Sequence, residues 1–197
     1  MVPMIDQKKQ ALRREQKAWL NSLAPQNKVE KEMALVKNLI SLFIQQSFES
    51  SQTVGGYAPL KDEASWLGFL KEQNSHLIAF PASFENQSDQ FSMQFYKCSF
   101  DELEENRDFG VPILTPPRNA EVVSPDILLI PGLAFSVKGK RLGRGKGYYD
   151  RYLHNYSGRR IGICFEEQLV DDVPSDDHDQ LLHILVTDKN IYHCHQT

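Results

Sequence analysis

The segment Ile127-Leu128-Leu129-Ile130-Pro131-Gly132 sets the fold class that we expect for this chain. Pro125 and Asp126 precede it, and a proline and a glycine end it, so the apolar run is short and clearly bounded. A run of this length without polar alternation is typical of a strand buried on both faces, as in a parallel sheet. We therefore place a central strand at residues 127–131. Ligand-binding residues are expected just beyond its carboxyl end.

Two amphipathic helices are predicted well before this strand. Residues 5–23 carry a narrow apolar stripe that includes Leu12, Trp19 and Leu23. A break at residues 24–27 separates this helix from a second one at about residues 30–48. The second helix has a broader apolar surface, which is suited to packing on a sheet.

Short apolar runs alternate with helical patterns along the rest of the chain. We expect strands at residues 53–57, 76–80 (ending at Pro81), 91–96, 160–165 and 182–187, helices at 63–73 and 147–155, and an edge strand at 191–195. This alternation predicts an α/β fold, as a single three-layer domain over residues 1–197 with a largely parallel central sheet.

Composition excludes several classes of protein. The 197 residues are 41% hydrophobic and 24% charged, which is globular composition with enough length for one core. The net charge of −4 gives no general attraction to nucleic acid or to an anionic membrane. There is no apolar run of about 18 residues, and residues 1–14 are polar and basic, so we expect neither a membrane span nor a signal peptide. The three cysteines, Cys98, Cys164 and Cys194, are odd in number and widely spaced, and they form no CxxC pair. We therefore expect reduced thiols in a cytoplasmic protein.

The basic glycine loop, residues 138–151, is the strongest chemical signal. It reads Lys138-Gly139-Lys140-Arg141-Leu142-Gly143-Arg144-Gly145-Lys146-Gly147-Tyr148-Tyr149-Asp150-Arg151, with six basic residues against one acidic residue. Alternating glycines allow successive backbone N–H groups to point at one oxyanion, because glycine tolerates positive φ. The helix expected after Gly147 adds the positive end of its dipole. These features predict a phosphate-binding loop in which Arg144 and Lys146 neutralise the anion. Its spacing is neither that of a Walker loop nor that of a dinucleotide fingerprint. A solvated basic turn is the alternative.

Two segments of the chain together resemble one family. Ile130-Pro131-Gly132-Leu133-Ala134-Phe135, followed by Gly139-x-Arg141-Leu142-Gly143-x-Gly145-x-Gly147-Tyr148-Tyr149-Asp150, closely resembles the signature of 5-formyltetrahydrofolate cyclo-ligases, also called methenyltetrahydrofolate synthetases. Weaker matches occur in the right order: Lys9-x-x-Leu12-Arg13, Tyr57-Ala58-Pro59 with Asp62-Glu63, Gln168-Leu169-Val170, Val173-Pro174 and His178-Asp179. The resemblance implies a fold related to ribose-phosphate isomerase and coenzyme A transferase domains. It also implies conversion of 5-formyltetrahydrofolate, ATP and Mg²⁺ into 5,10-methenyltetrahydrofolate, ADP and phosphate.

The resemblance also assigns roles to residues. ATP is expected to contact Lys9, Arg13, Arg141, Leu142, Gly143, Arg144, Gly145, Lys146, Gly147, Tyr148 and Tyr149. The reacting groups are expected to meet Arg144, Lys146 and Tyr148, and the folate to meet Tyr57, Ala58, Glu63 and Tyr148. Mg²⁺ is assigned to Asp150 and Asp179. The expected partner is the folate, with or without a polyglutamate tail, and not nucleic acid or a membrane. We expect a monomer.

Several local interpretations stay open beside these roles. Lys9 and Arg13 also suit a solvated helix face, Asp62 and Glu63 a helix start, Asp150 the charge at a helix end, and Asp179 a solvated acidic loop. Phe84, Phe91, Met93 and Phe95 suit strand packing, or a pocket for a flat ring. A metal site at His193 and His195 is the less favoured interpretation.

The chain departs from the family pattern at three places, and other functions remain alternatives. In residues 110–116 the acidic residue that the family commonly has is missing or displaced, His183 stands where an aspartate is common, and Thr187-Asp188 stands where the family has Thr-Glu. The competing functions are a non-catalytic folate- or nucleotide-binding regulator of the same fold, a nucleic-acid-binding module that uses the basic glycine loop, and a different small-molecule kinase or ligase.

Overall fold

A computed structural model describes residues 4–72, 76–84, 93–106, 113–175 and 180–194. Its central sheet has eight strands in the order β12 (Ile191–His193), β11 (Ile184–Val186), β10 (Arg159–Ile163), β7 (Ile127–Ile130), β1 (Thr53–Gly55), β2 (Leu77–Ala82), β3 (Gln94–Lys97) and β6 (Val122–Val123). The five strands from β11 to β2 pair in parallel, whereas β12, β3 and β6 pair antiparallel with their neighbours. The predicted central strand is β7, and the predicted edge strand is β12.

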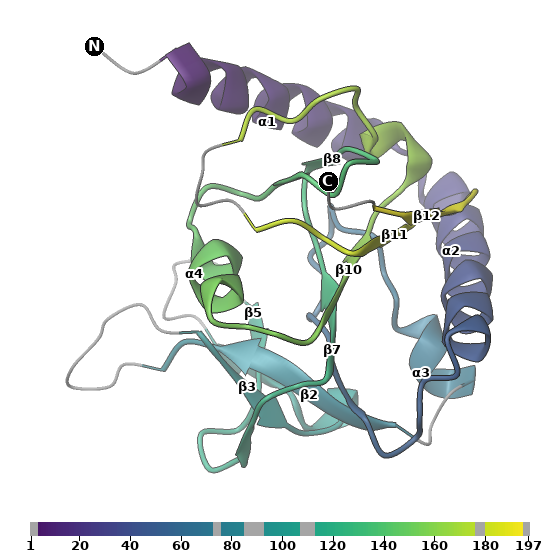
Figure 1. The fold of residues 1–197 in the computed structure, drawn as a ribbon, viewed down its shortest axis with the longest axis vertical. Coiled ribbons are helices and arrows are strands. Elements are labelled where there is room, and N and C mark those ends of the chain that lie inside the picture. Colours follow the sequence, from purple (N-terminus) through teal and green to yellow (C-terminus); the bar gives the residue numbers. More distant parts are fainter. Residues whose placement is uncertain (1–3, 73–75, 85–92, 107–112, 176–179, 195–197) are drawn as a thin grey trace.

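Helices cover both faces of this sheet. The helices α2 (Pro25–Gln45) and α3 (Gly68–Glu72) lie on one side, and α4 (Tyr148–His154) lies on the other (Figure 1). β7 shows why the sheet needs both layers: Ile127 and Leu129 join the hydrophobic cluster under α2, and Leu128 and Ile130 join the cluster under α4. All four side chains are fully buried. The prediction of an α/β fold with a largely parallel central sheet is confirmed.

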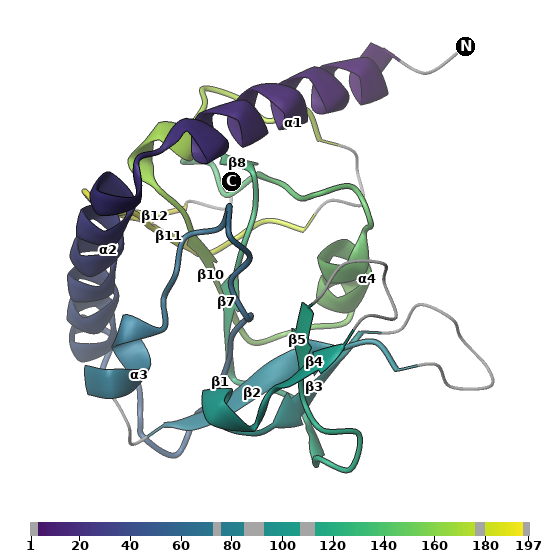
Figure 2. The same ribbon diagram turned by 180° about the vertical axis from the view of Figure 1, so that it is seen from behind.

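The first helix, α1 (Met4–Ser22), extends across one end of the sheet and lies beside β8 (Figure 2). β8 (Ala134–Phe135) and β9 (Arg141–Leu142) form a hairpin just after β7. Leu12 of α1 packs against the buried cluster of Ala134, Leu142 and Val173, the first two of which belong to this hairpin. This contact places α1 next to the basic glycine loop.

Smaller elements were not predicted from the sequence. They are the two-stranded sheet of β4 (Glu104–Asn106) and β5 (Ile113–Thr115), the hairpin of β8 and β9, the strand β6, and the 3₁₀ turns Phe100–Glu102 and Glu166–Gln168. None of the described helices combines the length and the apolar composition that crossing a bilayer requires.

Several predicted boundaries differ from those observed, and three of the differences have a clear physical reason. The second helix begins at Pro25 instead of about residue 30, because proline is favourable in the first turn of a helix. The strand β2 continues past Pro81 to Ala82. It can do so because the pairing with β1 ends at Ala79, so only β3 lies beside Pro81.

The third correction concerns the helix expected at residues 63–73, since α3 begins only at Gly68. Residues 60–63 instead form a turn. The Glu63 carboxylate accepts a hydrogen bond from the Leu60 N–H group (3.0 Å), and the Glu63 N–H group donates to the Leu60 carbonyl (2.9 Å). Asp62 and Glu63 therefore do not start a helix.

We predict that His183 makes the protein sensitive to mild acid. Its Nδ1 accepts a hydrogen bond from the Arg160 N–H group at 3.0 Å, and burial, followed by the charges of Arg160 and Arg159, lowers its pKa to about 4. The unfolded chain, with a histidine pKa of about 6.5, binds a proton that the folded chain resists. The free energy of unfolding should thus fall as the pH drops from about 6.5 to about 4.

Urea unfolding across this pH range measures the effect. His183→Gln should flatten the pH dependence, whereas His154→Gln, at an exposed position in α4, should leave it in place. An equal pH dependence in wild-type protein and His183→Gln would contradict the prediction.

Candidate active site

A cavity of about 420 Å³ lies at the carboxyl ends of β1, β2 and β7. The chain beyond each of these strands contributes to its wall: Tyr57 and Ala58 follow β1, Ser83 follows β2, and Pro131 and Gly132 follow β7. This edge is where ligands bind in α/β sheets, because the strand ends and the loops that follow them diverge there. The cavity is therefore the candidate active site.

The basic glycine loop forms one wall of this cavity. Gly145 and Gly147 have φ values of 95° and 68°, in the left-handed region that favours glycine. Gly147 immediately precedes α4, as predicted. Gly143 lies outside the left-handed region, so the expected positive φ is confirmed at two of the three alternating glycines. The loop contributes Arg141 and residues 143–150 to the lining.

Arg141 ties the two ends of the loop together through its guanidinium group. One terminal nitrogen donates to the Asp150 carboxylate at 2.5 Å, and the other donates to the Pro131 carbonyl at 3.2 Å. Its guanidinium carbon also lies 5.4 Å from the centroid of the Tyr149 ring. The side chain is only 5% exposed, so its charge is compensated inside the protein. Arg141 thereby joins the end of β7 to the start of α4.

Helix α1 supplies two further basic residues. Arg13 donates from Nε to the Gly143 carbonyl at 2.9 Å. Lys9, one turn earlier, is 8% exposed. The alternative of a solvated face is therefore wrong for these two residues, because one is buried and the other is bonded to the loop. Neither lines the cavity, and nor does Leu142, which is buried against α1.

Arg144 reaches across the cavity to the turn at residues 60–63. It donates from Nε to Glu63 Oε1 (2.9 Å), and from its two terminal nitrogens to the carboxylate of Asp62 (3.1 and 2.6 Å). Burial alone raises the pKa of Asp62, but the hydrogen bonds and the charge of Arg144 outweigh burial and hold that pKa below its usual range. Asp62 is thus an ionised partner of the loop that sequence reasoning did not include in the site.

Lys146 and Tyr148 are two further residues of the loop that line the cavity. Lys146 is exposed, and its ammonium group has no partner among the residues that the structure describes. Tyr148 is half-buried, with the Arg151 guanidinium 5.4 Å from its ring centroid. Lys146 is therefore placed to meet an anion from solvent.

The two remaining tyrosines at the cavity are more deeply placed. Burial, and then the charge of Glu63, raises the pKa of Tyr149, so its hydroxyl stays protonated; that oxygen is buried without a partner in the described part of the chain. The Tyr57 hydroxyl donates to the Ala64 carbonyl at 2.5 Å. Tyr57 therefore lines the cavity with a ring whose hydroxyl is already engaged.

The opposite wall is mostly apolar, and the sequence indicated it only weakly. Met93, together with Ile113, Leu114 and Thr115 of β5, lines the cavity there. Met93 lines the cavity and also packs against the core cluster under α4 that contains Phe95, so the two interpretations of that segment, strand packing and a pocket, each hold in part. Phe91 lies outside the described residues. Thr115 is buried within the segment 110–116, where the acidic residue of the family is missing.

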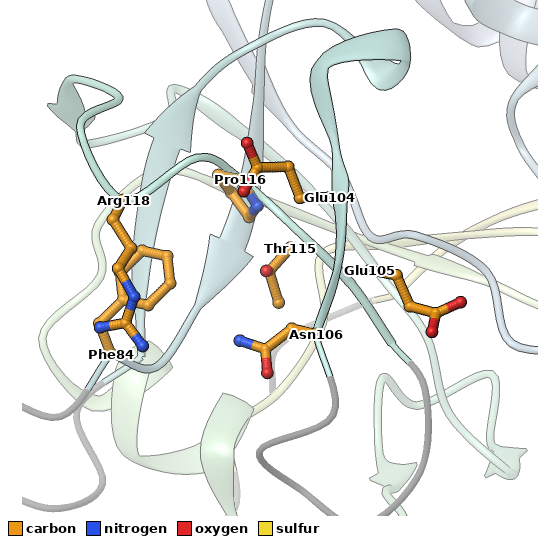
Figure 3. Close-up of a pocket in the computed structure, with 7 residues that line it drawn as sticks. All are labelled: Phe84, Glu104, Glu105, Asn106, Thr115, Pro116 and Arg118. Carbon is orange, nitrogen blue, oxygen red and sulfur yellow. The ribbon is translucent and has the colours of Figure 1, made fainter.

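A second cavity of about 350 Å³ adjoins the first (Figure 3). Thr115 lines both cavities, and Phe84, which follows Ser83 in the chain, lines the second. The Arg118 guanidinium carbon lies 4.9 Å from the centroid of the Phe84 ring. In Figure 3 the Asn106 side chain points towards this pair, and Glu105 points away from it. Residues of the basic glycine loop do not line the second cavity, which therefore lies away from that loop.

Asp150 and Asp179 are the residues predicted to bind Mg²⁺. No cluster of three or more potential metal ligands is found among the described residues. Asp150 lines the cavity, but its Oδ1 accepts the bond from Arg141. Its charge therefore serves the start of α4 and the Arg141 pair together. Asp179 and His195 lie outside the described residues.

We predict that Gly145→Ala damages the loop through its backbone. A Cβ at this position meets no atom closer than 3.4 Å, so the cost comes from the positive φ, at about 1–2 kcal/mol of unfolding free energy. The altered loop should also bind inorganic triphosphate more weakly. Urea unfolding and titration calorimetry measure the two effects. Gly68→Ala, outside the cavity, should leave triphosphate binding unchanged; equal binding by Gly145→Ala and wild-type protein would refute the anion-binding role.

Comparison with known proteins identifies the group to which the chain is related. A sequence model of the 5-formyltetrahydrofolate cyclo-ligase family matches residues 5–188. The 5-formyltetrahydrofolate cyclo-ligase of Mus musculus is 26% identical over 188 residues, which cover 89% of this chain and 91% of the mouse protein.

Two solved structures share the fold. The 5,10-methenyltetrahydrofolate synthetase of Aquifex aeolicus has a TM-score of 0.79 at 28% identity, covering 96% of this chain and 94% of its own. The corresponding synthetase of Mycoplasma pneumoniae has a TM-score of 0.70 at 24% identity, covering 91% of this chain and 98% of its own. The resemblance seen in the basic glycine loop thus extends over nearly the whole chain, which belongs to the 5-formyltetrahydrofolate cyclo-ligase family and is an enzyme.

Proposed function

We propose that this protein uses ATP and Mg²⁺ to close the ring of 5-formyltetrahydrofolate, forming 5,10-methenyltetrahydrofolate, ADP and phosphate. One observation carries the proposal: a single cavity has a basic glycine loop on one wall and an apolar wall facing it. The reaction needs both, because a phosphoryl donor must be held beside a flat, largely apolar ring system. Family membership supplies the substrate.

The chemistry explains why no protein nucleophile is required. The formyl oxygen attacks the γ-phosphorus of ATP, the bond to ADP breaks, and the oxygen becomes part of a good leaving group. The lone pair of N10 then attacks the formyl carbon. Phosphate departs with the electrons of the C–O bond, and N10 loses a proton. Such a reaction depends on positioning and on stabilisation of charge.

The residues of the basic glycine loop suit these tasks. Backbone N–H groups of residues 143–147 would hold the phosphates, and Lys146, whose ammonium group has no partner in the described structure, would neutralise the transferring group. Arg144 and Tyr148 would face the reacting oxygen. Lys9 and Arg13 would support the nucleotide from α1, where Arg13 already holds the Gly143 carbonyl.

Asp150 is the described residue best placed to hold Mg²⁺ with the phosphates. A nucleotide-bound Mg²⁺ needs only one or two protein carboxylates, because phosphate oxygens and water complete its octahedron. Asp150 meets this requirement, since among the described residues it is the aspartate that lines the cavity. When bound, the ion offsets negative charge on the phosphate oxygens. Asp179 is the second proposed carboxylate.

The folate would lie with its ring system against the apolar wall, between Tyr57, Ala58 and Met93. Glu63, at the base of the turn, would accept hydrogen bonds from the pterin. The p-aminobenzoyl-glutamate part would extend into the second cavity, where Arg118 supplies a positive charge. Because the segment 110–116 lacks the acidic residue that the family commonly has there, Glu63 would be the carboxylate that meets the folate among the described lining residues.

The pairing of the loop's arginines argues against the nucleic-acid alternative. Arg141 and Arg144 are bonded to Asp150, Asp62 and Glu63, so they do not form an open basic surface. We also propose that the protein acts in the cytoplasm, which the three free and buried cysteines support, and that it acts as a monomer.

A spectroscopic assay tests the proposed function. Purified protein is mixed with 5-formyltetrahydrofolate, ATP and Mg²⁺, and the near-ultraviolet absorbance of the methenyl product is followed. We expect the signal to grow only when ATP and Mg²⁺ are both present. A flat trace from folded protein that still binds ATP would favour the non-catalytic regulator, or a ligase with another substrate.

We predict that Lys146→Ala lowers turnover far more than it lowers folate affinity. Loss of the cation should reduce kcat about 100-fold or more, because charge stabilisation at the transferring group is a large part of such catalysis. Steady-state kinetics and folate titration measure the two effects. Lys138→Ala removes an exposed lysine of the same loop that does not line the cavity, and it should behave as the wild type. An unchanged kcat in Lys146→Ala would remove the lysine from the mechanism.

A further inference from the structure

The carboxylates of Asp62 and Glu63 both bind Arg144, but they lie on different sides of the cavity wall. Glu63 lines the cavity together with Arg144, whereas Asp62 is not among the residues that line it. Asp62 therefore contacts the guanidinium from outside the cavity. It makes two hydrogen bonds, at 2.6 and 3.1 Å, and Glu63 makes one, at 2.9 Å.

We propose that Asp62 is a positioning residue for the reaction: it fixes the plane of the Arg144 guanidinium, so that Arg144 meets the phosphates of ATP in one orientation. The proposal rests on the proposed function, in which Arg144 faces the transferring group. Asp62 itself touches neither the nucleotide nor the folate.

The number of donors permits this role. A guanidinium has five N–H groups, and the three printed bonds use one on Nε and one on each terminal nitrogen. One N–H group remains on each terminal nitrogen. Arg144 can therefore keep both carboxylates and still donate to an anion in the cavity.

The geometry explains why Glu63 alone does not suffice. A single bond through Nε leaves the guanidinium free to swing about that contact. The paired bonds to Asp62 engage both terminal nitrogens, which fixes the plane as well as the position. Asp62 is 18% exposed and its pKa lies below the usual range, because the bonds to Arg144 outweigh burial. The carboxylate is thus charged at neutral pH.

The turn that carries Asp62 is itself anchored. Lys28 of α2 donates to the Lys61 carbonyl at 2.7 Å, and Glu32 accepts from the Ser65 N–H group at 3.0 Å. The loop on the other side is held by Arg141 and Arg13. The Arg144 side chain is long and has many rotamers of its own. Because Asp62 lies on an anchored turn, its two hydrogen bonds restrict Arg144 to one of them.

The experiment is a double-mutant cycle on ATP affinity, measured by titration calorimetry without folate. It compares wild-type protein, Asp62→Asn, Arg144→Gln and the double variant. We expect Asp62→Asn to weaken ATP binding about 5- to 10-fold, and to have less than about a 2-fold effect when Arg144 is already replaced. The first result has a diagnostic sign: loss of a carboxylate near an anion strengthens binding if simple charge repulsion is the only effect.

Kinetics give a second measure, and a matched variant gives the control. Asp62→Asn should lower kcat while the KM for 5-formyltetrahydrofolate stays within about 2-fold, a split that general loosening of the fold would not produce. Asp172→Asn breaks the ion pair of Asp172 with Lys140 (2.7 Å), away from the cavity, and should change neither value.

Three outcomes would overturn the proposal: ATP affinity in Asp62→Asn that equals or exceeds that of the wild type, an equal loss in the Arg144→Gln background, or wild-type protein that does not bind ATP. If Asp62→Asn does not fold, Asp62→Glu keeps the charge but shifts it by one methylene. This variant should show an intermediate loss, and wild-type affinity in it would count against the proposal. If the double-mutant cycle on ATP affinity gives the expected result but the protein does not turn over 5-formyltetrahydrofolate, the proposed function is refuted and the positioning role of Asp62 towards bound ATP is not.

Discussion

The ion pair between the buried Arg141 and the partly exposed Asp150 is the interaction on which the site depends. Arg141 is almost fully enclosed, yet its guanidinium is satisfied by Asp150 and by the Pro131 carbonyl. Because an unpaired charge at such a place is costly, the pair fixes how the chain leaves β7 and how it enters α4. The intervening glycines can then take left-handed conformations that line the cavity, and Arg13 can bind the Gly143 carbonyl from α1.

The position of the basic glycine loop determines how the rest of the site is arranged. It lies opposite the turn at residues 60–63, and Arg144 spans the space between them. One side of the cavity therefore carries backbone donors and cations, and the other carries apolar side chains and Glu63. A triphosphate and a pterin have the matching properties. Bringing them together in one orientation is what the proposed reaction demands of a protein, because the reacting groups come from the substrates.

The sequence predicted the features that arise from local patterns. The buried run of β7, the helical stripe of α1 and the glycines before α4 each have a short-range signature, and each lies where it was expected. The resemblance to the family rested on the same loop. Most boundary errors also have local causes: Pro25 begins a helix instead of preceding one, and Glu63 closes a turn instead of starting a helix.

What the sequence could not provide is the pairing of residues distant along the chain. Arg144 and Asp62 are 82 residues apart, and nothing in either segment indicates that they meet. Ile113 and Leu114 likewise became part of the cavity only because β5 returns beside the end of β2, a contact with no local signature. For Lys9 the sequence left a solvated helix face open beside the ATP-binding role, and only the fold shows that the residue is buried.

The central claim is that the formyl oxygen of the folate becomes an oxygen of the released phosphate. The most direct test uses 5-formyltetrahydrofolate labelled with ¹⁸O in the formyl group, with ATP and Mg²⁺ in unlabelled water, and mass spectrometry of the phosphate product. The account predicts one ¹⁸O atom in each phosphate released with methenyl product. Methenyl product accompanied by unlabelled phosphate would contradict phosphoryl transfer to the formyl oxygen, and with it the role assigned to the basic glycine loop.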